Sequence, residues 1–161
     1  MTSPVKVRPA RPDDLDALGR LGTYLVAEHH EFDPKRFIAP LPDMPRRYGE
    51  FLESQAEGPD RFVLVAELDE TVVGYVFAGL EGADYMVLRG PAGAVYDLVV
   101  DPDHRRQGIG ATLLDAALKV LTARGAPRAV LSTAEKNVNA HRLFERNGFR
   151  RTMIEMTREL G

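Results

Sequence analysis

The stretch Arg105-Arg106-Gln107-Gly108-Ile109-Gly110 is the most informative part of the chain, because of what stands on either side of it. A strand-like run, residues 96–102, comes before it, and a helix-like run, residues 111–124, follows it. Two glycines let the backbone approach a bulky anion, and the start of a helix directs free N–H groups and partial positive charge at that anion. The two arginines add full charges. The stretch therefore predicts a phosphate-binding turn between a strand and a helix.

Apolar periodicity and chain breakers predict the other elements around this turn. Helices are expected over residues 12–31, 46–55, 111–124 and 137–147, and an irregular segment with four prolines over residues 33–45. Strands are expected over residues 5–8, 62–68, 72–80, 96–100, 129–132 and 149–157, with a tight hairpin at 69–71 and a surface loop over 82–93. This order predicts an α/β fold of the mixed α+β kind, with helices on both faces of one sheet.

Composition limits the class of protein. The chain has 161 residues, of which 44% are hydrophobic, and this size suits one domain spanning residues 1–161. The absence of cysteine excludes disulfides, thiolate metal sites and a cysteine nucleophile, and it fits a reducing cytosol. A net charge of −3 argues against general affinity for nucleic acid. No run is long and apolar enough for a signal peptide or a membrane span, so we expect a soluble, cytoplasmic protein with no nucleic-acid or membrane partner.

The same turn carries a family resemblance. Residues 99–110 resemble the acetyl-CoA loop of the GNAT N-acetyltransferase superfamily. The motif of that loop is Gln or Arg, any two residues, Gly, any one residue, and then Gly or Ala. Its three fixed positions are filled here by Arg105, Gly108 and Gly110. The second motif of that family is matched by Asn137, Ala140, Leu143 and Gly148-Phe149. Phe144 departs from it, because the family usually has Tyr there. The resemblance is strongest over residues 95–149, and it implies a mostly antiparallel central sheet.

The resemblance implies acetyl-CoA as the co-substrate and no metal. It also implies that the backbone of residues 98–100 pairs with the pantetheine arm and that the Val100 N–H stabilises the oxyanion. The cofactor-binding residues implied in this way are Leu98, Val99, Val100, Arg105, Arg106, Gln107, Gly108, Ile109, Gly110, Ala111, Asn137, Ala140 and Phe144.

Transfer of an acetyl group to an amine needs a base. An aliphatic amine has a pKa near ~10.4, so at neutral pH only about one molecule in a few thousand carries the free lone pair that attacks a thioester. Resemblance to the aminoglycoside 3-N-acetyltransferases makes Asp97 the first candidate and Tyr96 the second. Strand alternation puts Asp97 on one face with Val99, and Tyr96 on the other with Leu98. A bulge, usual in this strand of the family, would change that. The alternative is a structural carboxylate at a strand end.

The acceptor side carries a weaker signal. Glu28, His29, His30, Glu31 and Asp33 cluster at the end of the first predicted helix, in a segment that lines the acceptor cleft in this family. Acids there would attract a cationic amine, although a solvated helix end explains them equally well. The two histidines are adjacent, so they point roughly 100° apart and do not form a metal pair.

Three functions compete. The first is transfer of an acetyl group from acetyl-CoA to a primary amine of a small molecule or peptide, by direct attack. The second is a non-catalytic acyl-CoA-binding or interaction module on the same fold, for which Phe144 is the hint. The third, a nucleotide-phosphate binder of another class, is disfavoured because the chain has no Gly-x-x-x-x-Gly-Lys-Ser/Thr sequence. A homodimer is common among proteins that resemble this one, so it is a candidate assembly.

Overall fold

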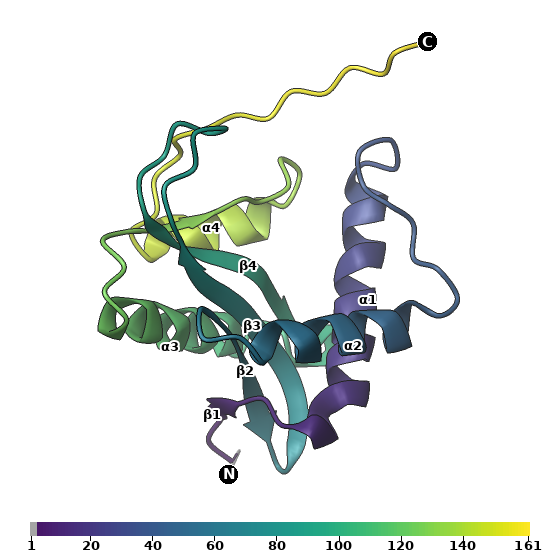
Figure 1. Ribbon diagram of the computed structural model, residues 1–161. Coiled ribbons are helices and arrows are strands. Elements are labelled where there is room, and N and C mark those ends of the chain that lie inside the picture. Colours follow the sequence, from purple (N-terminus) through teal and green to yellow (C-terminus); the bar gives the residue numbers. More distant parts are fainter. Residues whose placement is uncertain (1–2) are drawn as a thin grey trace.

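The computed structural model describes residues 3–161 and contains one five-stranded sheet with helices on both faces (Figure 1). In chain order, the elements are β1 (Lys6–Pro9), the short 3-10 helix η1 (Pro12–Asp14), α1 (Leu15–Phe32), α2 (Met44–Ala56), β2 (Arg61–Leu68), β3 (Thr71–Glu81), β4 (Ala92–Val100), the 3-10 helix η2 (Pro102–His104), α3 (Ile109–Ala123), β5 (Ala129–Leu131) and α4 (Val138–Arg146).

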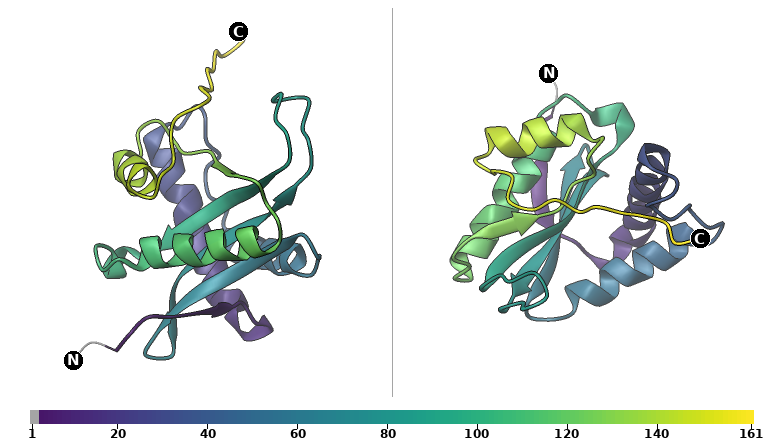
Figure 2. Two further views of the ribbon diagram at one scale, coloured as in Figure 1. Left: turned by 90° about the vertical axis from the view of Figure 1, so that its left-hand side faces the viewer. Right: turned by 90° about the horizontal axis from the view of Figure 1, so that it is seen from above.

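The sheet is mostly antiparallel, which confirms the expected fold class. Its strand order is β1-β2-β3-β4-β5; the first three pairs are antiparallel, and β4 and β5 are parallel. The view from above shows α3 and α4 on one side of the strands and α1 and α2 on the other (Figure 2). Each side has its own apolar core, so the strands are buried on both faces.

The turn between β2 and β3 is the tight hairpin that the sequence predicts. Asp69 and Glu70 have φ values of 48° and 62°, so both lie in the left-handed region that two-residue hairpin turns use. The resulting ladder pairs the whole of β2 with residues 71–79 of β3, with one register shift after Ala66. This hairpin forms the centre of the sheet.

Glycines inside α1 let α2 pack against it at very short range. A Cβ at Gly19 would lie 1.9 Å from the carbonyl oxygen of Pro45, and one at Gly22 would lie 2.1 Å from Cδ1 of Tyr48. Glycine in the interior of a helix lowers the stability of that helix by about 1 kcal/mol relative to alanine. In α1 the two glycines are needed all the same, because a larger side chain would prevent the close packing of α2. The contact fixes the position of the Tyr48 ring over the sheet.

A bulge in β4 changes which side chains face α1 and α2. The pairing with β3 shifts between Phe77, which pairs with Asp97, and Ala78, which pairs with Val95, so Tyr96 is the extra residue. Leu98 packs with the α3 core, whereas Tyr96 packs with the α1 and α2 core. The prediction that Tyr96 shares a face with Leu98 is therefore wrong, because the bulge interrupts the alternation.

The strand predicted over residues 149–157 is absent. Residues 149–161 are in no helix or strand, and from Arg150 onward their side chains are exposed. Strand-like periodicity indicates that a segment can form a strand, but a strand also needs a neighbour that pairs with its backbone groups. In this structure, residues 149–157 pair with neither edge of the sheet. The loop expected over 82–93 begins where predicted, after Glu81, but it ends earlier, because β4 begins at Ala92 and not at residue 96. Within the loop, Asp84 and Arg89 form an isolated bridge.

Candidate active site

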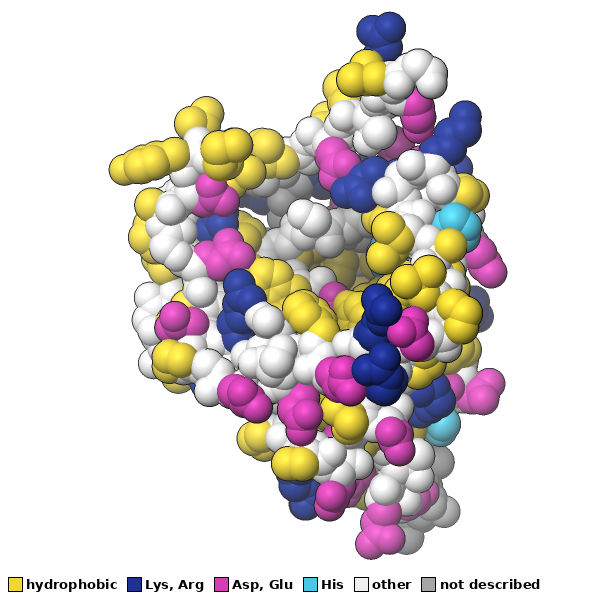
Figure 3. Space-filling view, turned by 45° about the vertical axis from the view of Figure 1, so that its right-hand side comes forward, with side chains coloured by type: hydrophobic (Ala, Val, Ile, Leu, Met, Phe, Trp, Pro, Cys, Tyr) yellow, Lys and Arg dark blue, Asp and Glu magenta, His cyan; other side chains and the backbone are white. Residues whose placement is uncertain are grey.

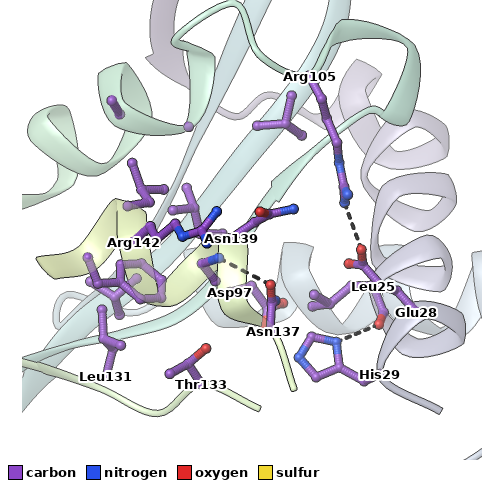
Figure 4. A pocket seen from close by; sticks show the side chains of 18 of the residues that line it. Leu25, Glu28, His29, Asp97, Arg105, Leu131, Thr133, Asn137, Asn139 and Arg142 are labelled. Atoms are coloured by element: carbon purple, nitrogen blue, oxygen red, sulfur yellow. Dashed lines mark hydrogen bonds and ion pairs between the residues drawn. The ribbon is translucent and has the colours of Figure 1, made fainter. Parts of the chain in front are cut away.

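A cavity of about 780 Å³ lies where β4 and β5 part. The two strands pair only over residues 93–95 of β4, so residues 96–100 have no strand neighbour on that side. The space-filling view shows the molecule hollowed between the side that carries α1 and the side that carries the β3–β4 hairpin (Figure 3). Side chains of α1, β4, α4 and the segments next to α3 and β5 line the cavity, and Glu28 and His29 face Asn139 and Thr133 across it (Figure 4).

The predicted phosphate-binding turn forms one end of this cavity. Arg106 and Gly108 have φ values of 62° and 76°, and α3 begins at Ile109 with Gly108 as its N-cap. A Cβ at Gly108 would meet no atom within 4 Å, so the space in front of the helix start is open. At Gly110, it would lie 3.4 Å from Cδ2 of Leu143. An open helix N-terminus with free N–H groups, beside two arginines, matches the needs of a pyrophosphate.

Arg105 connects this turn to α1. Its Nη2 donates to Oε1 of Glu28 at 3.0 Å, and its guanidinium carbon lies 5.2 Å from the ring centroid of Tyr24. Of the five residues at the end of α1 that were candidates for the acceptor side, Glu28 and His29 line the cavity. Glu28 thus meets the cavity as one half of an ion pair with Arg105.

Asp97 lies on the cavity wall and is held by two phenols. Tyr48 donates to its Oδ2 at 2.6 Å and Tyr75 donates to the same oxygen at 2.9 Å. Burial raises the pKa of Asp97 above its usual range, and the two phenol bonds and the nearby His29 partly oppose this change. Among residues 3–161, the other oxygen, Oδ1, accepts no hydrogen bond from the protein, so it is available to a group in the cavity.

Tyr96 also lines the cavity, but its surroundings favour the neutral phenol. Its hydroxyl donates to Oε1 of Glu81 at 2.7 Å, and burial, followed by this bond, raises the pKa of Tyr96 to about 12. A phenol with that pKa is ionised in only about one molecule in 10⁵ at neutral pH. Of the two candidate bases, Asp97 is therefore the better suited.

The two adjacent histidines of α1 point to different surroundings. Nδ1 of His29 lies 2.8 Å from the carbonyl oxygen of Leu25, which can only accept, so this nitrogen carries a proton. The ring of His29 packs edge-on against Phe32 and Phe37 at the cavity wall. His30 lies with its Nδ1 2.9 Å from the carbonyl oxygen of Phe37 and does not line the cavity.

The start of α4 forms the wall opposite α1. The side chain of Asn137 accepts from the N–H of Ala140 at 3.2 Å, which confirms the expected N-cap. Phe144 faces the cavity and packs against Phe149, with ring centroids 5.9 Å apart. No hydroxyl is present at this position to act as an acid.

Most of the candidate residues meet at this one cavity. Lining it are Tyr96, Asp97, Leu98, Val100, Arg105, Arg106, Gly108, Ile109, Gly110, Ala111, Asn137, Ala140 and Phe144. Val99 and Gln107 do not line it; the side chain of Val99 is buried in the α1 and α2 core, and its backbone pairs with Tyr75. The sequence did not identify Tyr48 and Tyr75 as partners of Asp97, because they are 49 and 22 residues away from it in the chain.

The structure was also searched, over the residues that it describes, for metal-binding clusters and for helices that could span a membrane. No group of three or more His, Asp or Glu side chains within residues 3–161 is arranged to hold a metal ion. Over the same residues, no helix has the length and apolar character needed to cross a membrane.

The fold and the site define the class of protein. The family model described as the acetyltransferase (GNAT) family matches residues 24–149, and the chain belongs to this family. Among solved structures, the fold of this chain resembles that of a mutant of the BH1408 protein from Bacillus halodurans, with a TM-score of 0.80, 23% identity, and 96% and 99% of the two chains covered. It also resembles an aminoglycoside N-acetyltransferase in complex with CoA, with a TM-score of 0.74, 17% identity, and 99% and 97% covered.

Two proteins are similar to this chain in sequence. Mycothiol acetyltransferase of Thermobispora bispora is 35% identical over 157 residues, which are 94% of this chain and 48% of the relative. The chain thus spans about half the length of that protein. An uncharacterised N-acetyltransferase of Archaeoglobus fulgidus is 29% identical over 149 residues, which are 91% of this chain and 94% of the relative.

Proposed function

We propose that this protein, as one acetyltransferase domain over residues 1–161, transfers an acetyl group from acetyl-CoA to a primary amine by direct attack. The observation that carries this proposal is the meeting of three features at one cavity. These are the open turn before α3, the unpaired backbone of β4 and the phenol-held carboxylate of Asp97.

The turn and the open edge of β4 suit the two ends of acetyl-CoA. The N–H groups at the start of α3, with Arg105 and Arg106, would hold the pyrophosphate. The N–H of Asp101 donates to Val73 of β3, and successive N–H groups along a strand point to opposite sides, so those of Val100 and Leu98 face the opening. The N–H of Leu98 would pair with a carbonyl oxygen of the pantetheine arm, which leaves the N–H of Val100 for the reacting carbonyl.

The same backbone geometry supports a role for Val100 in the reaction. An N–H group that faces the opening stabilises the negative charge that develops on the carbonyl oxygen when an amine attacks the thioester carbon. The C–N bond forms, the C–S bond breaks, and CoA leaves as a thiol once it has gained a proton. Because a free thiol has a pKa near ~8.5, its thiolate is a tolerable leaving group without the usual Tyr at position 144.

Asp97 would take the proton from the attacking amine, directly or through a water. Burial holds its pKa above that of an exposed carboxyl and so makes it a stronger base, while the bonds from Tyr48 and Tyr75 favour the ionised form and fix its orientation. A positioned base contributes about 10²–10⁴ in rate.

The acceptor is proposed to be a small molecule or peptide with a primary amine. Leu25, Phe37 and Ile38 supply apolar contacts on its side of the cavity, and His29 and Asp97 supply polar groups. Because one structural neighbour is named as an aminoglycoside N-acetyltransferase and one relative as a mycothiol acetyltransferase, amino sugars come first in a panel of acceptors.

The test is a screen of amines with acetyl-CoA, followed by the release of CoA thiol. The proposal predicts thiol release that depends on both the enzyme and one class of amine, and that saturates with each. The chain itself has no cysteine to disturb the thiol assay. Saturable binding of acetyl-CoA without amine-dependent thiol release from any amine would instead favour a binding module.

A further inference from the structure

Acetylation of an amine requires the removal of two protons from the same nitrogen. An aliphatic amine has an ordinary pKa near ~10.4, so at neutral pH it arrives at the cavity as an ammonium ion. One proton must leave before the nitrogen has a lone pair to attack with. The second must leave after the C–N bond forms, because the nitrogen of the tetrahedral adduct is positively charged again. Asp97 alone would have to release the first proton before it could accept the second.

His29 presents to the cavity a ring nitrogen that can accept a proton. Its Nδ1 lies 2.8 Å from the carbonyl oxygen of Leu25 and therefore carries the ring proton, which leaves Nε2 of the neutral ring with a free lone pair. Among residues 3–161, no protein group forms a hydrogen bond with Nε2. Figure 4 shows the ring extending from α1 into the cavity, with this second nitrogen on the side away from the bond to Leu25.

The position of this ring suits the acceptance of a proton. The ring packs edge-on against Phe32 and Phe37, with centroid distances of 5.7 and 5.1 Å, so its plane is fixed. His29 lies in the last turn of α1, and the C-terminal end of a helix stabilises positive charge. An imidazole is also ordinarily a stronger base than a carboxylate, so it takes a proton from an ammonium ion at a smaller cost in free energy.

Asp97 is electrostatically coupled to His29. Both side chains line the cavity, and the positive charge of protonated His29 lowers the pKa of Asp97. The other titratable or charged side chains on the cavity wall are Glu28 and Arg105, which pair with each other, and Tyr96, His104, Arg106, Arg142 and Arg146. A proton on His29 therefore favours an ionised Asp97, which is the state needed to accept the second proton.

From these observations, we propose that His29 acts as a second base in the reaction, an inference that rests on the proposed function. Nε2 of His29 takes the first proton from the ammonium ion, and the lone pair that this frees attacks the thioester carbon. Once the C–N bond has formed, Oδ1 of Asp97 takes the second proton. The C–S bond then breaks, and this second proton passes to the departing thiolate, directly or through a water, to give CoA thiol. The proton on His29 goes to solvent, so each turnover releases one proton.

The first test compares two amines of nearly equal size. At pH 7 ethylamine is an ammonium ion, whereas the fluorines of trifluoroethylamine keep its amine neutral, so only ethylamine needs the first proton removed. His29→Asn removes Nε2 but keeps an N–H near the position of Nδ1 for the carbonyl of Leu25. It should lower kcat/KM for ethylamine about 10²–10⁴-fold, as expected for a lost base, and leave trifluoroethylamine nearly unchanged. Equal losses with both amines, or no loss with either, overturn the inference.

Matched variants separate this role from others. His30→Asn, at the neighbouring residue that does not line the cavity, should keep native kcat/KM with both amines. Asp97→Asn should slow both amines, because each must lose the second proton. His29→Gln places near Nε2 an amide oxygen that accepts a hydrogen bond but no proton. If His29→Gln has native kcat/KM for ethylamine, His29 only orients the amine and the inference is wrong.

The pH dependence gives a second readout. Without Nε2, the enzyme depends on amine that is already free in solution, and this fraction rises about tenfold per pH unit below the pKa of the amine. For ethylamine, kcat/KM of His29→Asn should therefore rise with that slope from about pH 7 to pH 9, while kcat/KM of the native enzyme rises less steeply. Equal slopes contradict a proton transfer to His29.

A last measurement needs no acetyl transfer. In ring-nitrogen NMR of the native chain, the His29 signals are assigned by their loss in His29→Asn. Nδ1 should carry the proton, and the Nε2 signal should move when ethylamine is added to the complex with CoA. A neutral ring protonated at Nε2, or an Nε2 signal that does not move, overturns the inference. A native chain that acetylates neither amine counts against the proposed function, and the NMR result then decides the role of His29 by itself.

Discussion

Asp97→Asn is predicted to have opposite effects on stability and on turnover. The pKa of Asp97 is raised in the folded protein, chiefly by burial, and this net direction already includes the bonds from Tyr48 and Tyr75. A carboxyl with a raised folded pKa contributes stability below its unfolded pKa, and that contribution is lost as the pH rises through the folded value. At a pH above the folded pKa, the ionised side chain therefore destabilises the fold. Asparagine removes this charge, and its amide oxygen still accepts from both phenols.

The expected loss of turnover in Asp97→Asn equals the rate enhancement that a positioned general base provides. Removal of a positioned base lowers the rate about 10²–10⁴-fold, which corresponds to about 3–5 kcal/mol in the activation barrier. Acetyl-CoA binding should be unaffected, because the turn before α3 and the open edge of β4 do not involve this carboxylate. The expected signature is a higher Tm at pH 7, an unchanged Kd for acetyl-CoA and a strongly reduced kcat.

Tyr48→Phe separates the base from its support. Loss of the 2.6 Å bond removes one of the two phenol bonds that lower the pKa of Asp97, so the acidic limb of the pH–rate profile should move to higher pH while the carboxylate remains. Thermal melts, calorimetric titration with acetyl-CoA and a pH series of kcat check these expectations. An Asp97→Asn enzyme with native turnover and a native pH profile would refute the role of Asp97.

Four further changes test other parts of the structure. Acetyl-CoA at ~100 times its Kd should increase the free energy of unfolding by about 2.7 kcal/mol and raise the Tm by roughly 5–11 °C. Gly110→Val should abolish this Tm shift. A Tm shift with ATP but not with acetyl-CoA would contradict the assignment of the turn. Phe144→Tyr should raise kcat modestly at most; transfer seen only in this variant would mean that the native chain is a binding module. Gly22→Ala should lower both Tm and kcat, because its Cβ would lie 2.1 Å from Tyr48, whereas Gly58→Ala, in open space, serves as the control. The bond from Arg8 lowers the pKa of Asp14, so Asp14→Asn should cost stability above the unfolded pKa of a carboxyl, and urea unfolding at falling pH should show this cost disappear.

Local signals explain how much of the fold could be predicted. The glycine-rich turn, the hairpin at residues 69 and 70 and the N-cap at Asn137 each depend on a few neighbouring residues, and the structure has all three. Glycines 19 and 22 weakened the prediction of the first helix because their packing partners, Pro45 and Tyr48, come from another helix.

The rest of the site depends on contacts between distant parts of the chain. The bulge at Tyr96 reverses the face expected from alternation, and the phenols that hold Asp97 come from α2 and β3. Such features follow from tertiary packing, which a single sequence does not reveal.

The most direct test of acetyl transfer compares the amount of CoA thiol released with the amount of acetylated amine formed, the latter identified by mass spectrometry. Direct attack within the β4–β5 cavity predicts one acetylated amine for each thiol, with both products lost together in Asp97→Asn. Thiol release without acetylated amine would mean hydrolysis of acetyl-CoA, and it would contradict the account of this protein as an amine acetyltransferase.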